Sequence, residues 1–139
     1  MLEFLRNGCK PCTLTSNPLA EALGGTLLEI DPAAGSALLA FEPTAHFLQG
    51  DAVLQGGVLA CMLDFAMAFA AHGVLGEEER PFATATLTVH FLRPAPAAAL
   101  VARGTVRQLG RRVIFADGEL RARAAARTLA TASALMPLR

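Results

Sequence analysis

The 139-residue chain contains no tryptophan, no tyrosine and only three cysteines. Three cysteines cannot build a disulfide framework. The pair Cys9-Lys-Pro-Cys12 also lacks the second cysteine or histidine pair that would complete a zinc site. We therefore predict no bound metal, and we expect Cys61 to be a small core residue. The 12 basic and 12 acidic side chains leave no net charge, so nucleic acid is not a predicted partner.

The chain also lacks an uninterrupted apolar run of the roughly 20 residues that a membrane span requires. The closest segment, 53–71, is broken by Gln55, by two glycines and by Asp64, and we expect it to be a central core helix. The N-terminus Met-Leu-Glu-Phe-Leu-Arg has no basic region followed by an apolar one, so no signal peptide is expected. These features predict a soluble, cytoplasmic protein with no membrane partner. We expect one domain over 17–139, preceded by an N-terminal extension over 1–16.

The charges are unevenly distributed along the chain. Residues 1–92 carry three basic and ten acidic side chains, whereas residues 93–139 carry nine arginines against Asp117 and Glu119. Solvated strand faces explain this distribution. A phosphorylated ligand bound by the C-terminal half also explains it, because arginine suits phosphate by geometry and by permanent charge.

The local patterns predict one long helix among strands. Asn17-Pro18 before Leu19–Leu23 and the stop Gly24-Gly25 predict a short helix. Strands are expected over 26–30 and 36–41, followed by an ordered loop to residue 54 and a long helix ending near His72-Gly73. From Thr84 to Leu92 the period is two, which predicts a strand with threonines and His90 on one face. Three more strands are expected over 99–108, 112–120 and 126–135. This order favours an antiparallel sheet and an α+β fold.

Asp64 is the single carboxylate in the most apolar stretch of the chain. A helix that is apolar on every side is expected to be buried, and a buried carboxylate is costly unless it is paired or hydrogen-bonded. Asp64 therefore either faces a solvated cleft or has surroundings that adjust it for a functional role. In a purely structural role, threonine hydroxyls could also satisfy its hydrogen bonds. The small residues at 57, 60, 61, 68 and 71 share its side of the helix. They allow either a second helix or the sheet to approach closely.

Several motifs, taken together and in order, resemble a known family over residues 17–136. They are Asn17-Pro18 with Ala22-Leu23-Gly24, Gly56-Gly57 with Leu63-Asp64, Val89-His90-Phe91-Leu92-Arg93-Pro94, and Gly110-Arg111-Arg112. The chain resembles the PaaI-like (phenylacetate-degradation) branch of hotdog-fold acyl-CoA thioesterases. The resemblance implies a sheet wrapped around the long helix, and dimers that often pair into tetramers.

Two positions depart from that family's pattern. Gln55 stands where the family usually has a histidine before the two glycines, and Gln49 stands where it often has an asparagine. Gln55 can donate a hydrogen bond to a carbonyl group but cannot shuttle protons as histidine does. A non-catalytic module that binds acyl-CoA is therefore the alternative to an enzyme. A dehydratase is a more distant alternative, because no suitably spaced Asp/His pair is evident.

Hydrolysis of a thioester needs a base or nucleophile and donors for the oxyanion. Gly56 and Gly57 begin a helix, where free N–H groups point outward and a missing side chain allows close approach. We expect Asp64 to act as general base or nucleophile, with Gln55 orienting the carbonyl group. The predicted substrate contacts are Gln49, Phe65 as part of an apolar lining, and Arg111 and Arg112 at the phosphates of coenzyme A. Coenzyme A is thus part of the substrate, and no cofactor is expected.

The spacing of these groups predicts a shared site. Gly56 and Asp64 are about 12 Å apart along a straight helix at roughly 1.5 Å per residue, whereas catalytic contacts are near 3 Å. Two antiparallel helices related by a two-fold axis would bring the start of one helix to the carboxylate of the other. We therefore expect an obligate homodimer, and the family resemblance implies the same.

Overall fold

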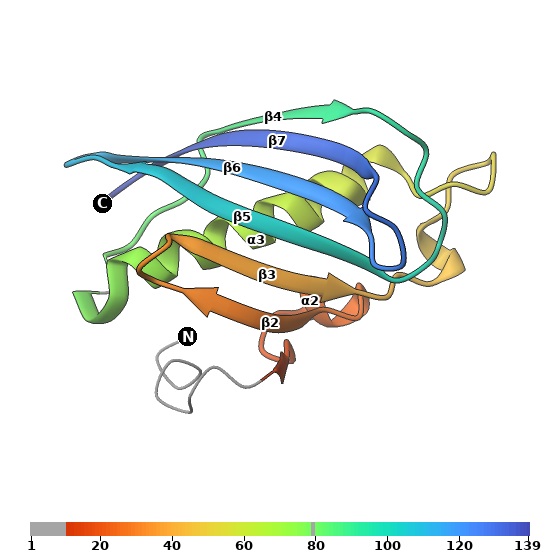
Figure 1. Cartoon of the computed structure of the whole chain (residues 1–139), viewed down its shortest axis with the longest axis horizontal. Helices are drawn as coiled ribbons and strands as arrows, with labels where there is room; N and C mark the ends of the chain where they lie inside the picture. Colours follow the sequence, from red (N-terminus) through yellow and green to blue (C-terminus); the bar gives the residue numbers. More distant parts are fainter. Residues whose placement is uncertain (1–10, 79) are drawn as a thin grey trace.

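One antiparallel sheet of seven strands curves around a single long helix (Figure 1). The computed structural model describes residues 11–78 and 80–139, so Cys9 and most of the expected extension 1–16 lie outside the described residues. The strands follow the order β1-β2-β3-β5-β6-β7-β4, and every pair is antiparallel. The elements are β1 (Cys12–Thr13), α2 (Pro18–Ala22), β2 (Thr26–Asp31), β3 (Ser36–Phe41), η1 (Ala45–Phe47), α3 (Gly56–Leu75), η2 (Gly76–Glu78), β4 (Thr86–Phe91), β5 (Leu100–Leu109), β6 (Val113–Ala122) and β7 (Thr128–Pro137). The predicted fold, a central helix wrapped by an antiparallel sheet, is confirmed.

Two glycines let the central helix lie directly on the sheet. Gly104 of β5 pairs with Gly118 of β6. A Cβ atom added to Gly104 would lie 2.1 Å from the carbonyl oxygen of Ala66, and one added to Gly118 would lie 3.1 Å from Leu63 Cδ2. The missing side chains therefore allow α3 to approach the backbone of the sheet closely, and the buried residues of α3 fill the core around this contact.

The helix ends later than the sequence predicted. The expected stop at His72-Gly73 is wrong, because α3 continues to Leu75 and is closed by Gly76, which has a positive φ of 59°. Gly73 instead marks a close contact, since a Cβ atom there would lie 2.9 Å from Cγ2 of Ile30. Both glycines interrupt the pattern equally in sequence, but only Gly76 adopts a positive φ, a backbone conformation that other residues rarely adopt.

Other boundaries differ slightly from expectation. Residues 12–13, which belong to the expected N-terminal extension, form the strand β1 against Thr26 and Leu27. The short helix α2 begins as predicted, because the side chain of Asn17 accepts hydrogen bonds from the N–H groups of Leu19 and Ala20. The strand expected from Thr84 begins at Thr86, after a bend at Ala85.

Within the described residues, one segment, Gly56–Glu78, is long and apolar enough to cross a membrane by composition alone. In this fold α3 packs against β3, β5 and β6, and about half of the segment is buried inside the protein. A core helix of a soluble protein has the same composition, and this packing accounts for the apolar sequence.

Candidate active site

Asp64 lies near the middle of α3 with a half-buried side chain. The hydroxyl group of Thr84 donates a hydrogen bond to Oδ1 of Asp64 at 2.7 Å. Within the part of the chain that the structure describes, Oδ2 of Asp64 has no such partner. The carboxylate is therefore held by one oxygen and remains accessible through the other.

Cys61 lies one helical turn before Asp64 and is also half-buried. Burial raises the pKa of the Cys61 thiol above its usual value of 9.0, and the negative charge of Asp64 raises it further. The thiol is therefore protonated near neutral pH and is a poor nucleophile. Cys61 was expected to be a small core residue; it is partly buried and packs against the core from outside.

The start of α3 presents free backbone donors. Gln55 precedes the helix; its N–H group donates to the carbonyl oxygen of Phe47 at 3.0 Å, and its exposed side chain makes no capping hydrogen bond. Among the described residues, no acceptor is bonded to the N–H groups of Gly56 and Gly57. These donors lie at the positive end of the helix dipole.

The two glycines differ in their surroundings. A Cβ atom on Gly56 would lie 3.2 Å from the ring of Phe91, whereas one on Gly57 would meet no atom within 4 Å. Contact with Phe91 within the same chain thus favours glycine at position 56. Nothing within the described chain requires glycine at position 57, whose open side faces solvent.

A cavity of about 340 Å³ borders the start of α3. It brings together two predicted site residues, Gln49 and Gly56, with the end of β4 and with Arg93. The guanidinium group of Arg93 donates a hydrogen bond to the carbonyl oxygen of Thr128, the first residue of β7. One of the Arg93 donors is therefore already used within the fold.

Phe65 lines a different cavity, of about 370 Å³, between α3 and the segment around α2. The residues that line it are Leu14, Ser16, Asn17, Ala20, Phe65, Ala68, Phe69 and His72. Phe69, one turn further along the helix, is also half-buried and lines the same cavity. Within one chain, Phe65 and Gln49 therefore border separate spaces.

Arg111 and Arg112 lie far from the start of the helix. Both are exposed in the turn between β5 and β6, at the end of the molecule where α3 finishes (Figure 1). The guanidinium group of Arg80, which follows η2, donates to the carbonyl oxygen of Arg111. The 20 residues of α3 span about 30 Å at roughly 1.5 Å per residue, so one chain does not bring these arginines to Gly56 and Gly57.

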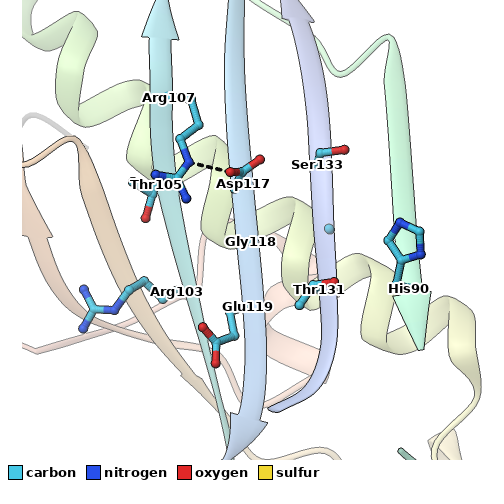
Figure 2. A pocket seen from close by; sticks show the side chains of 10 residues that line it. His90, Arg103, Thr105, Arg107, Asp117, Gly118, Glu119, Thr131 and Ser133 are labelled. Atoms are coloured by element: carbon cyan, nitrogen blue, oxygen red, sulfur yellow. Dashed lines mark hydrogen bonds and ion pairs between the residues drawn. The ribbon is translucent and has the colours of Figure 1, made fainter. Parts of the chain in front are cut away.

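A third cavity, of about 420 Å³, lies on the face of the sheet that points away from α3 (Figure 2). Its polar lining includes an ion pair between Arg107 and Asp117. None of the residues predicted for the site lines this cavity. The candidate site is therefore on the helix side of the sheet.

Comparison with known proteins identifies the family. A family profile described as "Thioesterase superfamily" matches residues 52–127. The chain belongs to the thioesterase superfamily. No match was found among curated proteins.

Solved structures narrow the identification of this thioesterase. A phenylacetic acid degradation-related protein from Ralstonia eutropha JMP134 is 32% identical, covers 98% of each chain and superposes with a TM-score of 0.83. The PaaI protein of E. coli is 27% identical, covers 88% of this chain and 85% of its own, and gives a TM-score of 0.79. A mutant PaaI from Thermus thermophilus is 26% identical over 87% of this chain and 98% of its own, with a TM-score of 0.76. The predicted PaaI-like hotdog assignment is confirmed.

A threonine hydroxyl bonded to Asp64 was among the alternatives in the sequence, but Thr84 was not identified as that threonine. Thr84 was expected to lie on a strand face with Thr86, Thr88 and His90, but the bend at Ala85 places it outside β4 and turns it toward the helix. The alternation of residue types continues through the bend, so the pattern itself contains no signal for this change. Asp64, Gln55, Gly56 and Gly57 remain predicted catalytic residues.

Proposed function

We propose that this thioesterase hydrolyses an acyl-CoA, with an aryl or a short- to medium-chain acyl group, to the free acid and CoA. Membership of the family supports thioester hydrolysis in general. The observation that carries the finer proposal is the half-buried carboxylate of Asp64, oriented by Thr84 at one oxygen and open at the other.

The proposed reaction uses Asp64 as a general base. Oδ2 removes a proton from a water molecule, whose oxygen attacks the thioester carbonyl carbon. The N–H groups of Gly56 and Gly57 stabilise the resulting oxyanion, and Gln55 orients the carbonyl group. The tetrahedral intermediate then collapses, the carbon–sulfur bond breaks, and the thiolate of CoA leaves and takes up a proton.

A nucleophilic variant of this mechanism uses the same residues. Asp64 would attack the carbonyl carbon and expel the thiolate, forming a mixed anhydride that water then hydrolyses. An acyl adduct on Asp64, trapped and detected by mass spectrometry during a single turnover, would identify this route.

The site is proposed to form between two chains. The N–H groups of one helix and the Asp64 of the same helix are too far apart to act on one carbonyl group, as the predicted separation of about 12 Å indicates. Of the small residues beside Asp64, Gly57 is exposed and those at 60, 61 and 68 are only partly buried, which supports close approach by a second helix, whereas Ala71 is buried.

The edge of the sheet also supports a homodimer. β4 is the last strand in the sheet, so one of its edges is unpaired within the chain, and Phe91 and Leu92 at its end are 54% exposed. An unpaired apolar edge favours pairing with another strand. A two-fold axis at β4 would extend the sheet and set the two helices side by side.

Substrate contacts are proposed on the same basis. The acyl group would occupy the cavity beside Phe65, whose lining is largely apolar, and Gln49 would lie near the thioester at the start of the helix. Arg111 and Arg112 would bind the nucleotide phosphates of CoA through charge-assisted hydrogen bonds.

The test is a thiol-release assay on a panel of CoA thioesters that differ in acyl group. We expect turnover by the unaltered protein and a loss of about 100-fold or more in kcat for Asp64→Ala, as for removal of a general base. Binding of acyl-CoA without turnover in the unaltered protein would instead favour the non-catalytic module, for which the replacement of histidine by Gln55 is the main indication.

A further inference from the structure

Arg80 meets two arginines that are distant from it in sequence, Arg111 and Arg112, at one corner of the molecule. Arg80 donates hydrogen bonds through both terminal nitrogens to the carbonyl oxygen of Arg111, at 3.3 Å each. On the other side of the turn, the N–H group of Leu138 donates to the carbonyl oxygen of Arg112 at 2.8 Å. We call Arg80, Arg111 and Arg112 the arginine corner. Its turn is held from both sides, so the two turn side chains start from a fixed backbone.

Among the described residues, the arginine corner has no bonded counter-ion. Across residues 11–78 and 80–139, the single ion pair is the one between Arg107 and Asp117, on the outer face of the sheet. The side chains of Arg111 and Arg112 are exposed, and Arg80 is partly exposed. Like charges gathered without a counter-ion repel one another, and binding of an anion relieves that repulsion.

We propose that Arg80 is a positioning residue for the phosphate end of CoA, acting through its hold on the turn that carries Arg111 and Arg112. This inference rests on the proposed function, which supplies the acyl-CoA ligand. Because Arg80 bonds a backbone carbonyl group with a planar guanidinium, it fixes the direction in which the turn presents its two side chains.

The distance from Asp64 to the corner matches the length of the CoA arm. Asp64 and the last residue of α3, Leu75, are about 16 Å apart along the helix at roughly 1.5 Å per residue. The pantetheine arm has about thirteen bonds from sulfur to phosphorus and extends roughly 15 Å, if each three bonds reach about 3.5 Å as in a peptide chain. A thioester at Asp64 would therefore place its phosphates near the corner of the same chain.

The surroundings of the corner favour a small polyphosphate over an acidic protein. Glu77 and Glu78 of η2 are exposed and lie just before Arg80 in the chain. They would repel the acidic surface of an acyl carrier protein, whereas the compact phosphates of a nucleotide need contact only the arginines. CoA is thus the favoured source of the phosphate, and a carrier-protein thioester is the competing outcome.

The test compares one acyl group on two carriers, CoA and N-acetylcysteamine, which lacks the nucleotide. We expect the double variant Arg111→Ala/Arg112→Ala to raise KM for the CoA thioester at least ten-fold and Arg80→Ala to raise it three- to ten-fold, with kcat and the N-acetylcysteamine reaction changed less than two-fold. Arg103→Ala, which removes an exposed arginine from the outer face of the sheet (Figure 2), is the matched control and should leave both reactions unchanged.

Arg80→Lys separates position from charge, because lysine keeps the charge but loses the planar fork. We expect this variant to behave like Arg80→Ala. If the KM of Arg80→Lys for the CoA thioester equals that of the unaltered protein, the positioning role of Arg80 is overturned. Equal KM for both carriers, or a preference for a carrier-protein thioester, would overturn the phosphate site.

Calorimetric titration with CoA distinguishes failure of this inference from failure of the proposed function. If the Arg80 and Arg111/Arg112 variants bind CoA more weakly than the unaltered protein, the phosphate site at the arginine corner is supported, even if no thioester is hydrolysed. Hydrolysis with CoA binding unaffected by these variants would leave the proposed function standing and would overturn the corner.

Discussion

The hydroxyl group of Thr84 donates a 2.7 Å hydrogen bond to Oδ1 of Asp64 and joins the segment before β4 to the middle of α3. Because β4 is the edge strand of the sheet, this bond couples the position of the carboxylate to the strand where we propose that a second chain attaches. Orientation of the acid and assembly of the dimer are thus expected to depend on the same segment.

Removal of the Thr84 hydroxyl should reduce catalysis without disrupting the fold. Thr84→Val keeps the shape of the side chain but loses a hydrogen bond to a charged group, which contributes about 1.5 kcal/mol, so we expect kcat to fall roughly ten-fold. Thr84→Ser keeps the hydroxyl and should retain most of the activity. Equal kcat values for the two variants in steady-state assays would show that the bond does not orient Asp64 for catalysis.

The reactivity of Cys61 should report the charge of Asp64. Burial and that charge both raise the thiol pKa above 9.0, so alkylation of Cys61 should be slow at pH 7 and should accelerate as the pH rises above 9. Asp64→Asn removes the second cause and should shift the rate profile to lower pH. The measurement requires Cys9→Ser and Cys12→Ser in the background, and an unshifted profile would contradict the assigned cause.

The raised pKa of the Cys61 thiol also predicts how the free energy of unfolding changes at alkaline pH. In the unfolded chain Cys61 loses its proton at a lower pH than in the folded protein, so the folded state binds more protons above pH 9. The contribution of the neutral thiol to the free energy of unfolding is present below pH 9 and is lost as the pH rises through the raised pKa. Urea denaturation across this range should show a smaller decline for Cys61→Ala than for the unaltered chain.

Substitution of alanine for Gly104 and for Gly57 should have very different effects on the free energy of unfolding. In Gly104→Ala the new Cβ atom would lie 2.1 Å from the backbone oxygen of Ala66, so we expect a loss of about 3 kcal/mol or more in the free energy of unfolding. In Gly57→Ala the new Cβ atom meets no atom within 4 Å, and alanine is the better helix former. The free energy of unfolding should therefore stay within about 0.5 kcal/mol of that of the unaltered protein. If Gly57 admits the substrate, kcat of Gly57→Ala should nevertheless fall ten-fold or more. Full activity would remove Gly57 from the proposed oxyanion site.

Local patterns in the sequence were enough to predict the main helices and strands of the fold, although not the short strand β1. Alternating residues marked the strands after the helix, and Asn17, Pro18 and Gly24 marked the short helix, because each acts on its immediate neighbours. The end of the long helix was misplaced because Gly73 and Gly76 look alike in sequence. One is required by contact with Ile30 and the other by its backbone angle.

Long-range relationships at the candidate site could not be predicted in the same way. The bond from Thr84 to Asp64 depends on a bend at Ala85 that leaves the alternating pattern unchanged. The separation of Arg111 from Gly56 depends on how β5 runs beneath the helix, which only the three-dimensional structure provides. Asp64 was identifiable because a single charge in an apolar helix is unusual in itself.

The most direct test of the shared site is activity in a mixed dimer of Asp64→Ala and Gln55→Ala chains, purified with two different tags. Each homodimer should be impaired, whereas the heterodimer combines an intact Asp64 from one chain with an intact Gln55 from the other. We predict that its kcat per dimer recovers to about half that of the unaltered protein. A verified heterodimer no more active than the two parent variants would contradict a site built from both chains.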